Sequence, residues 1–250
     1  MAAIRVLLAG ESWVASSTHM KGWDFFSSTV YEVGTESLEK ALAGDGFVFE
    51  HMPSHVAATH FPTTLDGLRC YDVIILSDIG ANTLLLHPDT WLRGQSTPNR
   101  LKLLKAWVEA GGGLAMCGGY LSFAGIYASA KYYRTAIEDV LPVNIHTFDD
   151  RIEAPEGVAP EVVAAAHPIL KGVQGDWPLL LGYNELTMKP GAHLLAKVGD
   201  HPMLAARTVG QGRTLIWASD IGPHWCPQPF LDWPGYALIW QQAIRWLAGA

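Results

Sequence analysis

Short, mainly apolar runs of strand length constrain the fold of this chain more than any other feature of its sequence. The runs occupy residues 4–9 (IRVLLA), 47–51 (FVFEH), 73–76 (VIIL) and 114–117 (LAMC). Segments with helical spacing of apolar residues separate them, at 37–43, 64–68 and 101–110. Continuous apolar runs are typical of strands buried on both faces, and strand–helix alternation predicts parallel strands joined by right-handed crossovers. We therefore expect an α/β fold in which helices flank a flavodoxin-like, doubly wound and mostly parallel sheet.

The second half of the chain has a different pattern. Shorter strands are predicted at 179–183, 193–198, 203–209 and 214–218. Glycine-containing turns such as VGD and GQGR join several of them, which favours extra antiparallel strands in this half. Helices are predicted at 132–140 and 235–247. No linker or internal repeat divides the sequence, so residues 1–250 are expected to form a single domain.

Two segments, residues 12–33 and 80–98, are long for connections, and residues 146–178 form a Pro/Glu/Ala-rich excursion that contains HPIL. Long loops in compact domains are often functional, and we expect this of the first two.

Charge and composition exclude several classes of partner. The chain carries 17 Lys and Arg against 24 Asp and Glu, a net charge of −7, and has no basic cluster. We therefore expect neither nucleic acid nor a membrane as a partner, and no segment has the roughly 20 apolar residues of a transmembrane helix. Three scattered cysteines form neither a disulfide framework nor a metal knuckle, which favours a reducing, cytoplasmic location. The apolar start is too short to be a signal peptide.

A candidate nucleophile, Cys117, follows a predicted strand in GGGLAMCGGY. The small residues two before and two after it, Ala115 and Gly119, satisfy the steric requirement of a nucleophile elbow. A helix beginning at Gly118 would lower the thiol pKa, and the Gly118 and Gly80 amides would form an oxyanion hole. A buried cysteine at the end of a core strand explains the same residues equally well.

Four further polar residues follow predicted strands, at the edge where doubly wound sheets bind ligands. His224, in DIGPHW, is a candidate general base for Cys117, and Asp220 would orient it. Glu11 is a second candidate acid or base, and Asp78 follows another strand in the same way. For each of them, local capping or turn hydrogen bonds are the structural alternative.

Aromatic and histidine residues near these positions are candidates for the walls of a substrate pocket. They are Trp13, His19, Tyr120 and Trp225, together with Asp78. A metal site formed by His224, Cys226 and an acid is a separate alternative, although no HxH or HExxH spacing is present. We expect no metal or other cofactor.

These motifs resemble those of the class I glutamine amidotransferase-like superfamily. AMCGG is similar to its cysteine elbow, and Glu11 stands where one branch of the superfamily places a glutamate after the first strand. More specifically, the chain resembles a bacterial cytoplasmic family of glutamine amidotransferase-like proteins. The segments that carry this resemblance are GESW (10–13), GGYLSFAG (118–125), HPIL (167–170), DIGPHW (220–225) and WPGYALIWQQAIRWLAG (233–249). HPILKG and GQGRTLIWASD are similar to trehalose-utilisation-type proteins of the same fold. Class I enzymes carry a glutamate two residues after the catalytic histidine, where this chain has Cys226.

Together, the motifs and the resemblance predict a cysteine-dependent hydrolase or amidase for a small polar amide or related carbonyl compound. Cys117 would attack the carbonyl carbon, His224 would transfer the proton, and Glu11 or Asp220 would tune it. One alternative is a non-catalytic module that binds a small molecule or builds an oligomer. The other is a metal-assisted hydrolase that uses His224 and Cys226. The aromatic-rich loops also favour a homodimer.

Overall fold

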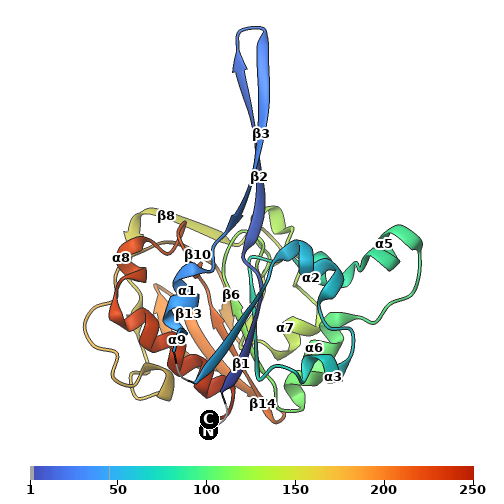
Figure 1. Cartoon of the computed structure of the whole chain (residues 1–250). Helices are drawn as coiled ribbons and strands as arrows, with labels where there is room; N and C mark the ends of the chain where they lie inside the picture. Colours follow the sequence, from blue (N-terminus) through green and yellow to red (C-terminus); the bar gives the residue numbers. More distant parts are fainter. Residues whose placement is uncertain (1–2, 45) are drawn as a thin grey trace.

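Five parallel strands form one side of an eight-stranded sheet in the computed structural model, which describes residues 3–44 and 46–250 (Figure 1). In spatial order they are β4 (Phe47–Met52), β1 (Ile4–Gly10), β5 (Val73–Ser77), β6 (Gly113–Cys117) and β14 (Gly212–Trp217). The sheet continues with antiparallel pairing through β13 (His201–Val209), β12 (His193–Val198) and β9 (Glu161–Val162). The predicted fold class, a mostly parallel α/β sheet with extra antiparallel strands in the C-terminal half, is confirmed.

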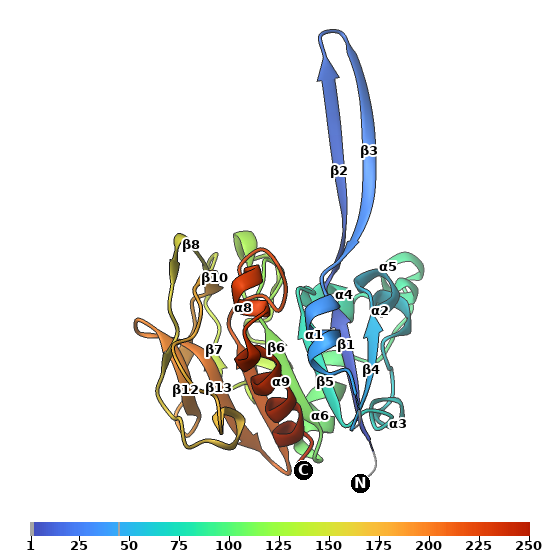
Figure 2. The ribbon, with the colours of Figure 1, turned by 60° about the vertical axis from the view of Figure 1, so that its left-hand side comes forward.

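Helices cover both faces of this sheet (Figures 1 and 2). One face carries α1 (Glu36–Ala41), α9 (Pro234–Leu247) and α8 (Gln228–Leu231). On the other face, α6 (Arg100–Glu109) packs against α3 (Leu65–Leu68), α4 (Ala81–Leu85) and α7 (Ala136–Val140), and α4 packs against α2 (Ser54–His60). Because both faces are shielded, β5 and β6 are completely buried. None of the described helices is long and apolar enough to cross a membrane.

Arg100, the first residue of α6, ties together the helices of that second face. Its side chain is buried, and its guanidinium donates hydrogen bonds to the carbonyl oxygens of Ala57, Ala58, Thr83 and Leu84. These carbonyls belong to the last turns of α2 and α4, where the helix dipole gives carbonyl oxygens a partial negative charge. Arg100 thereby holds the two helices that follow β4 and β5 against the sheet.

The segment 12–33, expected as a loop, forms a hairpin that projects from the sheet at the carboxyl ends of its parallel strands (Figures 1 and 2). Its strands are β2 (Ser12–Lys21) and β3 (Asp24–Val33), and their pairing runs without a break from Ser12↔Val33 to Lys21↔Asp24. Gly22, with a φ of 68°, allows the tight turn at the tip. β3 is rich in β-branched and aromatic residues, which favours a strand there, whereas β2 contains three of them, Trp13, Val14 and Thr18.

Three other secondary-structure predictions were incomplete. Segment 80–98 contains α4 and α5 (Pro88–Arg93). Segment 146–178 contains β8 (Arg151–Val158), β9 and the 3-10 turn η2 (Pro168–Leu170), and β8 pairs with β10 (Leu180–Asn184) beside the main sheet. The helix predicted at 132–140 is only α7, because Arg134 has a φ of 56°, which an α-helix does not accommodate. The remaining described elements are η1 (Ile126–Ala128) and the strand pair β7 (Val143–Asn144) and β11 (Thr187–Met188).

Candidate active site

A cavity of about 330 Å³ opens at the carboxyl edge of the parallel strands. Its lining residues are Glu11, Trp13, Asp78, Tyr120, Asp220, Pro223 and His224. All of them follow the ends of β1, β5, β6 and β14, because parallel strands deliver their carboxyl ends to the same edge of a sheet. Apart from Pro223, each lining residue was a predicted site residue.

Glu11 follows β1 directly, with a φ of 47°, in the left-handed region that favours glycine. Its side chain is buried, and the Ser77 hydroxyl donates a 2.5 Å hydrogen bond to its carboxylate. Burial, and then the carboxylates of Asp78 and Asp220, raise the pKa of Glu11 well above its ordinary value. Glu11 therefore keeps its proton to a higher pH than an ordinary glutamate.

Asp78 follows β5 in the same way, with a φ of 43°. Its Oδ1 accepts a 2.6 Å hydrogen bond from the backbone N–H of Leu121, and its own N–H donates to the Ser122 hydroxyl. Burial raises the pKa of Asp78 to about 6. Strained backbone at two adjacent strand ends is a feature that clusters at functional sites.

His224 and Asp220 form the opposite wall of the cavity. The imidazole Nδ1 lies 2.8 Å from Oδ2 of Asp220, and this hydrogen bond raises the pKa of His224 above its ordinary value. The edge of the ring meets Tyr120, with 4.7 Å between centroids, and its face stacks on Trp225. His224 has a φ of 130°, a third strained position around one cavity. Because Nδ1 is occupied by Asp220, Nε2 is the nitrogen free for chemistry.

Gly119 separates the two aspartates. A Cβ placed on this residue would lie 3.0 Å from Oδ1 of Asp220 and 3.0 Å from Oδ1 of Asp78, and its φ of 132° also requires glycine. Buried Asn184 fixes the turn by accepting a hydrogen bond from the Gly119 N–H and donating one to Asp150. The absence of a side chain at Gly119 thus lets the two carboxylates approach each other.

Two positioning residues were missed in the sequence. Glu153, on β8, accepts 2.9 Å hydrogen bonds from the Tyr120 hydroxyl and from the Trp225 indole. The Arg151 guanidinium, also on β8, lies 4.5 Å from the centre of the Tyr120 ring. They orient the aromatic residues that pack on His224. Alternation of polar and small residues in RIEAPEGV was the available signal, but this strand lay inside a segment interpreted as a loop.

Cys117 is placed differently from a nucleophile at an elbow. It ends β6 in regular register with Trp217, is completely buried, and does not line the cavity. Its φ is not positive, whereas a nucleophile elbow holds its reactive residue in strained backbone. Burial, and then the Glu11 carboxyl group, raise the thiol pKa well above its ordinary value, so the predicted lowering of this pKa is wrong.

The helix predicted to begin at Gly118 is also wrong, since the chain forms turns and bends from Gly118 to Gly125. The Gly118 N–H donates to the carbonyl oxygens of Trp217 and Ser219, at 2.7 and 2.9 Å. Gly80 caps the start of α4 and packs near Ala130. Gly118 and Gly80 therefore make backbone contacts that shape the end of β6 and the start of α4, and neither residue lines the cavity.

The remaining predicted residues lie outside the cavity. His19 is exposed on the hairpin, where its ring stacks on Phe26. Trp225 is buried behind Tyr120 and His224. Burial raises the pKa of the Cys226 thiol. Within residues 3–44 and 46–250, no group of three or more His, Cys, Asp and Glu side chains is arranged to hold a metal ion.

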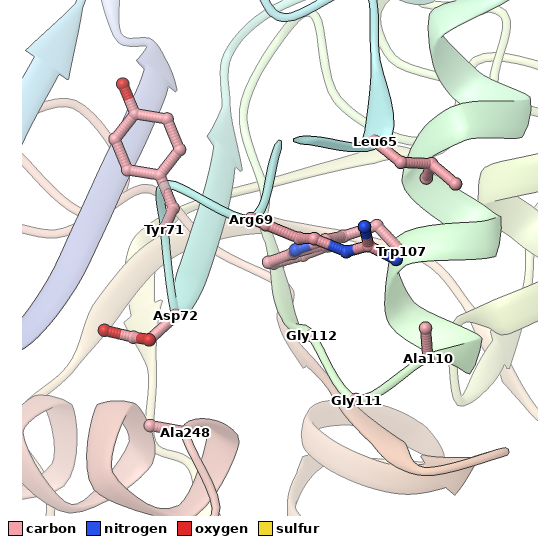
Figure 3. A pocket seen from close by; sticks show the side chains of 9 residues that line it. All are labelled: Leu65, Arg69, Tyr71, Asp72, Trp107, Ala110, Gly111, Gly112 and Ala248. Carbon is pink, nitrogen blue, oxygen red and sulfur yellow. The ribbon is translucent and has the colours of Figure 1, made fainter. Parts of the chain in front are cut away.

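A second cavity, of about 230 Å³, lies at the opposite edge of the sheet. Figure 3 shows Leu65, Arg69 and Trp107 gathered above the glycine turn at 111–112. Arg69 forms an ion pair with Asp66 at 2.7 Å. Strained backbone and carboxyl groups of raised pKa gather at the first cavity, which is the candidate active site.

Comparisons with known proteins agree with this fold. A family model described as "GATase1_like: Putative glutamine amidotransferase" matches residues 5–249. The solved structure of a cytoplasmic protein from Salmonella typhimurium has 40% sequence identity and a TM-score of 0.93, covering 97% of this chain and 98% of its own. A second cytoplasmic protein, from Salmonella typhimurium LT2, also has 40% identity and a TM-score of 0.93, with coverage of 98% and 99%.

A more distant structure shares the fold alone. A "Putative thua-like protein" from Bacteroides uniformis has 15% identity and a TM-score of 0.56, covering 98% of this chain and 91% of its own. A search of curated proteins found no match.

Proposed function

The chain belongs to the GATase1_like family of "putative glutamine amidotransferases", and we propose that it is a hydrolase whose acid–base residues, not a thiol, act on a small polar carbonyl compound. The observation that carries this proposal is the 2.8 Å hydrogen bond between His224 and Asp220 at the wall of a cavity that also contains Asp78 and Glu11. We further propose a cytoplasmic location, because two similar proteins from Salmonella typhimurium are described as cytoplasmic.

His224 acts as the general base in this proposal. Asp220 holds Nδ1–H and stabilises the imidazolium that forms when Nε2 takes a proton from a water molecule. The resulting hydroxide adds to the carbonyl carbon of the substrate. Because catalytic groups work best when their pKa lies near the operating pH, a histidine of raised pKa suits this role.

Asp78 and Glu11 supply the acid. The pKa of Asp78 is about 6, so a fraction of this residue is protonated near neutral pH and donates its proton to the leaving nitrogen or oxygen. Glu11, whose pKa is also raised, hydrogen-bonds the substrate in its neutral form. The proton that His224 took from water then passes to Asp78, which restores both groups for the next turnover. The raised pKa of Asp78 brings its titration closer to neutral pH, where a general acid works best.

The walls favour a small substrate that is neutral or positively charged. Trp13 and Tyr120 offer aromatic faces, and three acidic side chains line the remainder. A substrate with amide or hydroxyl groups would donate hydrogen bonds to the carboxylates and pack its carbon skeleton on the rings.

Hydrolysis assays on a small panel of probes test this proposal. The panel is L-glutamine, L-asparagine and p-nitrophenyl acetate, with ammonia or nitrophenolate as the readout. For a probe that the wild-type chain hydrolyses, we expect His224→Gln to lower kcat/KM by about 100-fold or more. Cys117→Ala should retain the wild-type rate, because its sulfur does not reach the cavity.

Two outcomes would overturn the proposal. Loss of activity in Cys117→Ala, with activity retained in His224→Gln, would restore the thiol nucleophile. Absence of hydrolysis of every probe by the wild-type chain would favour a non-catalytic binding pocket.

A further inference from the structure

The β2–β3 hairpin extends away from the body of the protein (Figures 1 and 2). Every residue of β3 and nearly every residue of β2 is exposed. The apolar side chains are among the most exposed of the chain: Trp23 at the tip is fully exposed, and Met20 and Phe25 are 74% and 70% exposed. Only the base touches the body, where the Tyr31 ring meets that of His55 edge-on.

Such a hairpin is an unfavourable structure in isolation. A two-stranded ribbon is at best marginally stable in water, because it lacks a core on either face. Its exposed apolar face and unpaired edges also invite association. A second surface that covers one face would remove this disadvantage.

The two faces of the hairpin differ in charge. Side chains alternate between faces along a strand, and directly paired residues share a face. His19, Lys21, Asp24 and Glu32 all lie on one face, which also carries Trp13 and Phe26. The other face has no charged side chain. We call it the uncharged face, and its residues are Ser12, Val14, Ser16, Thr18, Met20, Phe25, Ser27, Thr29, Tyr31 and Val33.

The uncharged face is complementary to itself. An apolar cluster lies near its base, formed by Val14, Tyr31 and Val33, and a second lies near its tip, formed by Met20 and Phe25. Between them are two hydroxyl pairs, Ser16 with Thr29 and Thr18 with Ser27, each separated by 3.3 Å. When two such faces meet in opposite directions, the tip cluster of one copy lies on the base cluster of the other. The small hydroxyl residues then cross at the middle, where the two backbones approach each other most closely.

We propose that the uncharged face of the hairpin is the dimer interface of this protein, and that its occupant is the same face of a second copy packed antiparallel about a two-fold axis. An interface of this kind is isologous, so one surface serves both copies. Aromatic side chains carry roughly 150–250 Å² each and the others less, so the uncharged face at its exposed fractions presents on the order of 700 Å². A stable interface buries about 800 Å² per partner, so this face supplies most of the required area.

A pair of adjacent substitutions tests the face directly. Thr18→Lys places a charge in the middle of the uncharged face, and Ser17→Lys places the same charge on the opposite face of the same strand. Two lysines brought together in a dry interface raise the dissociation constant of the dimer by at least about 100-fold. Sedimentation equilibrium of the full chain should therefore show a wild-type dimer, a Thr18→Lys monomer and a Ser17→Lys dimer. Circular dichroism and the thermal midpoint of each variant establish that it is folded.

Disulfide cross-linking in a Cys70→Ser background tests the direction of packing, because Cys70 is an exposed thiol. Antiparallel packing brings residue 14 of one copy near residue 20 of the other. Air oxidation should therefore link Val14→Cys protein to Met20→Cys protein when the two are mixed, and should link neither to itself. Linkage of each variant to itself would overturn the antiparallel arrangement.

A monomeric wild-type chain at micromolar concentration would overturn the interface itself. A dimer that Thr18→Lys leaves intact, or that both lysine variants weaken equally, would do the same.

Discussion

The Nδ1 atom of His224 lies 2.8 Å from Oδ2 of Asp220, and the same carboxylate oxygen accepts a 3.0 Å hydrogen bond from the Trp225 N–H. The backbone N–H fixes the carboxylate, and the carboxylate fixes the imidazole. The tight turn at Gly222 and Pro223 returns the chain toward Asp220, which places a residue four positions later within reach of it. The pKa of His224 therefore reports on the electrostatics of the candidate active site.

Asp220→Asn should lower the pKa of His224. The hydrogen bond to Asp220 is the largest cause of the raised pKa, and partial burial, which remains in the variant, acts in the opposite direction. The His224–Asp220 pair therefore stabilises the folded state below the ordinary pKa of histidine. This contribution is lost as the pH rises through the raised pKa of His224 in the folded protein. NMR titration of the His224 ring measures the shift. Asp89→Asn, beside His87, is the matched control and should leave the His224 titration unchanged.

Asp78→Asn should stabilise the protein at alkaline pH. The folded-state pKa of Asp78 is about 6, above its ordinary value of 3.8. A raised pKa favours the folded state fully below the ordinary value, and this advantage is lost as the pH rises through about 6. Urea unfolding at pH 8 should therefore show a gain of about 1–3 kcal/mol in Asp78→Asn. The gain should disappear near pH 4.

Asp149→Asn provides a control of opposite sign. Its ion pair with Arg151 lowers the pKa of Asp149, so the pair stabilises the fold above the ordinary pKa and is lost as the pH falls. The variant should be less stable than the wild type at pH 7. A loss of stability at pH 8 in Asp78→Asn would contradict the inferred burial of that charge.

The sequence predicted the sheet well because its central strands are specified by composition alone. The runs at 73–76 and 114–117 are β5 and β6, buried on both faces, and no polar residue interrupts their pattern. The same topology explains why Glu11, Asp78, Asp220 and His224 line one cavity. The carboxyl ends of parallel strands meet at one edge of a sheet. For these four residues, a position shortly after a predicted strand was therefore enough to predict that they lie together.

The sequence could not predict in this way whether Cys117 is a nucleophile. Small neighbours are required for a nucleophile elbow, but they also allow a strand end to pack tightly, and Gly118 lies against the backbone of Ala218. Whether Cys117 lies at a nucleophile elbow or at a packed strand end depends on its own φ and on whether a helix follows it. The neighbouring residues alone determine neither feature. Glu153 was missed for a related reason: β8 pairs with a strand outside the main sheet, and its alternation of polar and apolar residues is short because Pro155 interrupts it.

Cys117 should react slowly with alkylating reagents in the folded protein. Burial excludes the reagent and raises the thiol pKa, so little thiolate exists at neutral pH. Mass spectrometry after a brief exposure to iodoacetamide at pH 8 should find label on exposed Cys70 and none on Cys117. The same exposure in urea should label all three cysteines, Cys70, Cys117 and Cys226. Rapid labelling of Cys117 in the native chain would show that the sulfur is accessible and would favour the nucleophile elbow.

Arg100→Met should be among the most destabilising single substitutions in the chain. Methionine keeps most of the apolar volume but leaves four carbonyl oxygens of α2 and α4 without the donors that Arg100 provides. Because hydrogen bonds from a buried charged group contribute about 1.5–3 kcal/mol and unpaired buried acceptors add a further cost, we expect the free energy of unfolding to fall by at least about 3 kcal/mol. Arg93→Met, on α5, is the control: its exposed ion pair with Asp89 should contribute less than about 1 kcal/mol. Urea unfolding followed by tryptophan fluorescence measures both variants, and equal losses would show that Arg100 has no special role in holding α2 and α4 against the sheet.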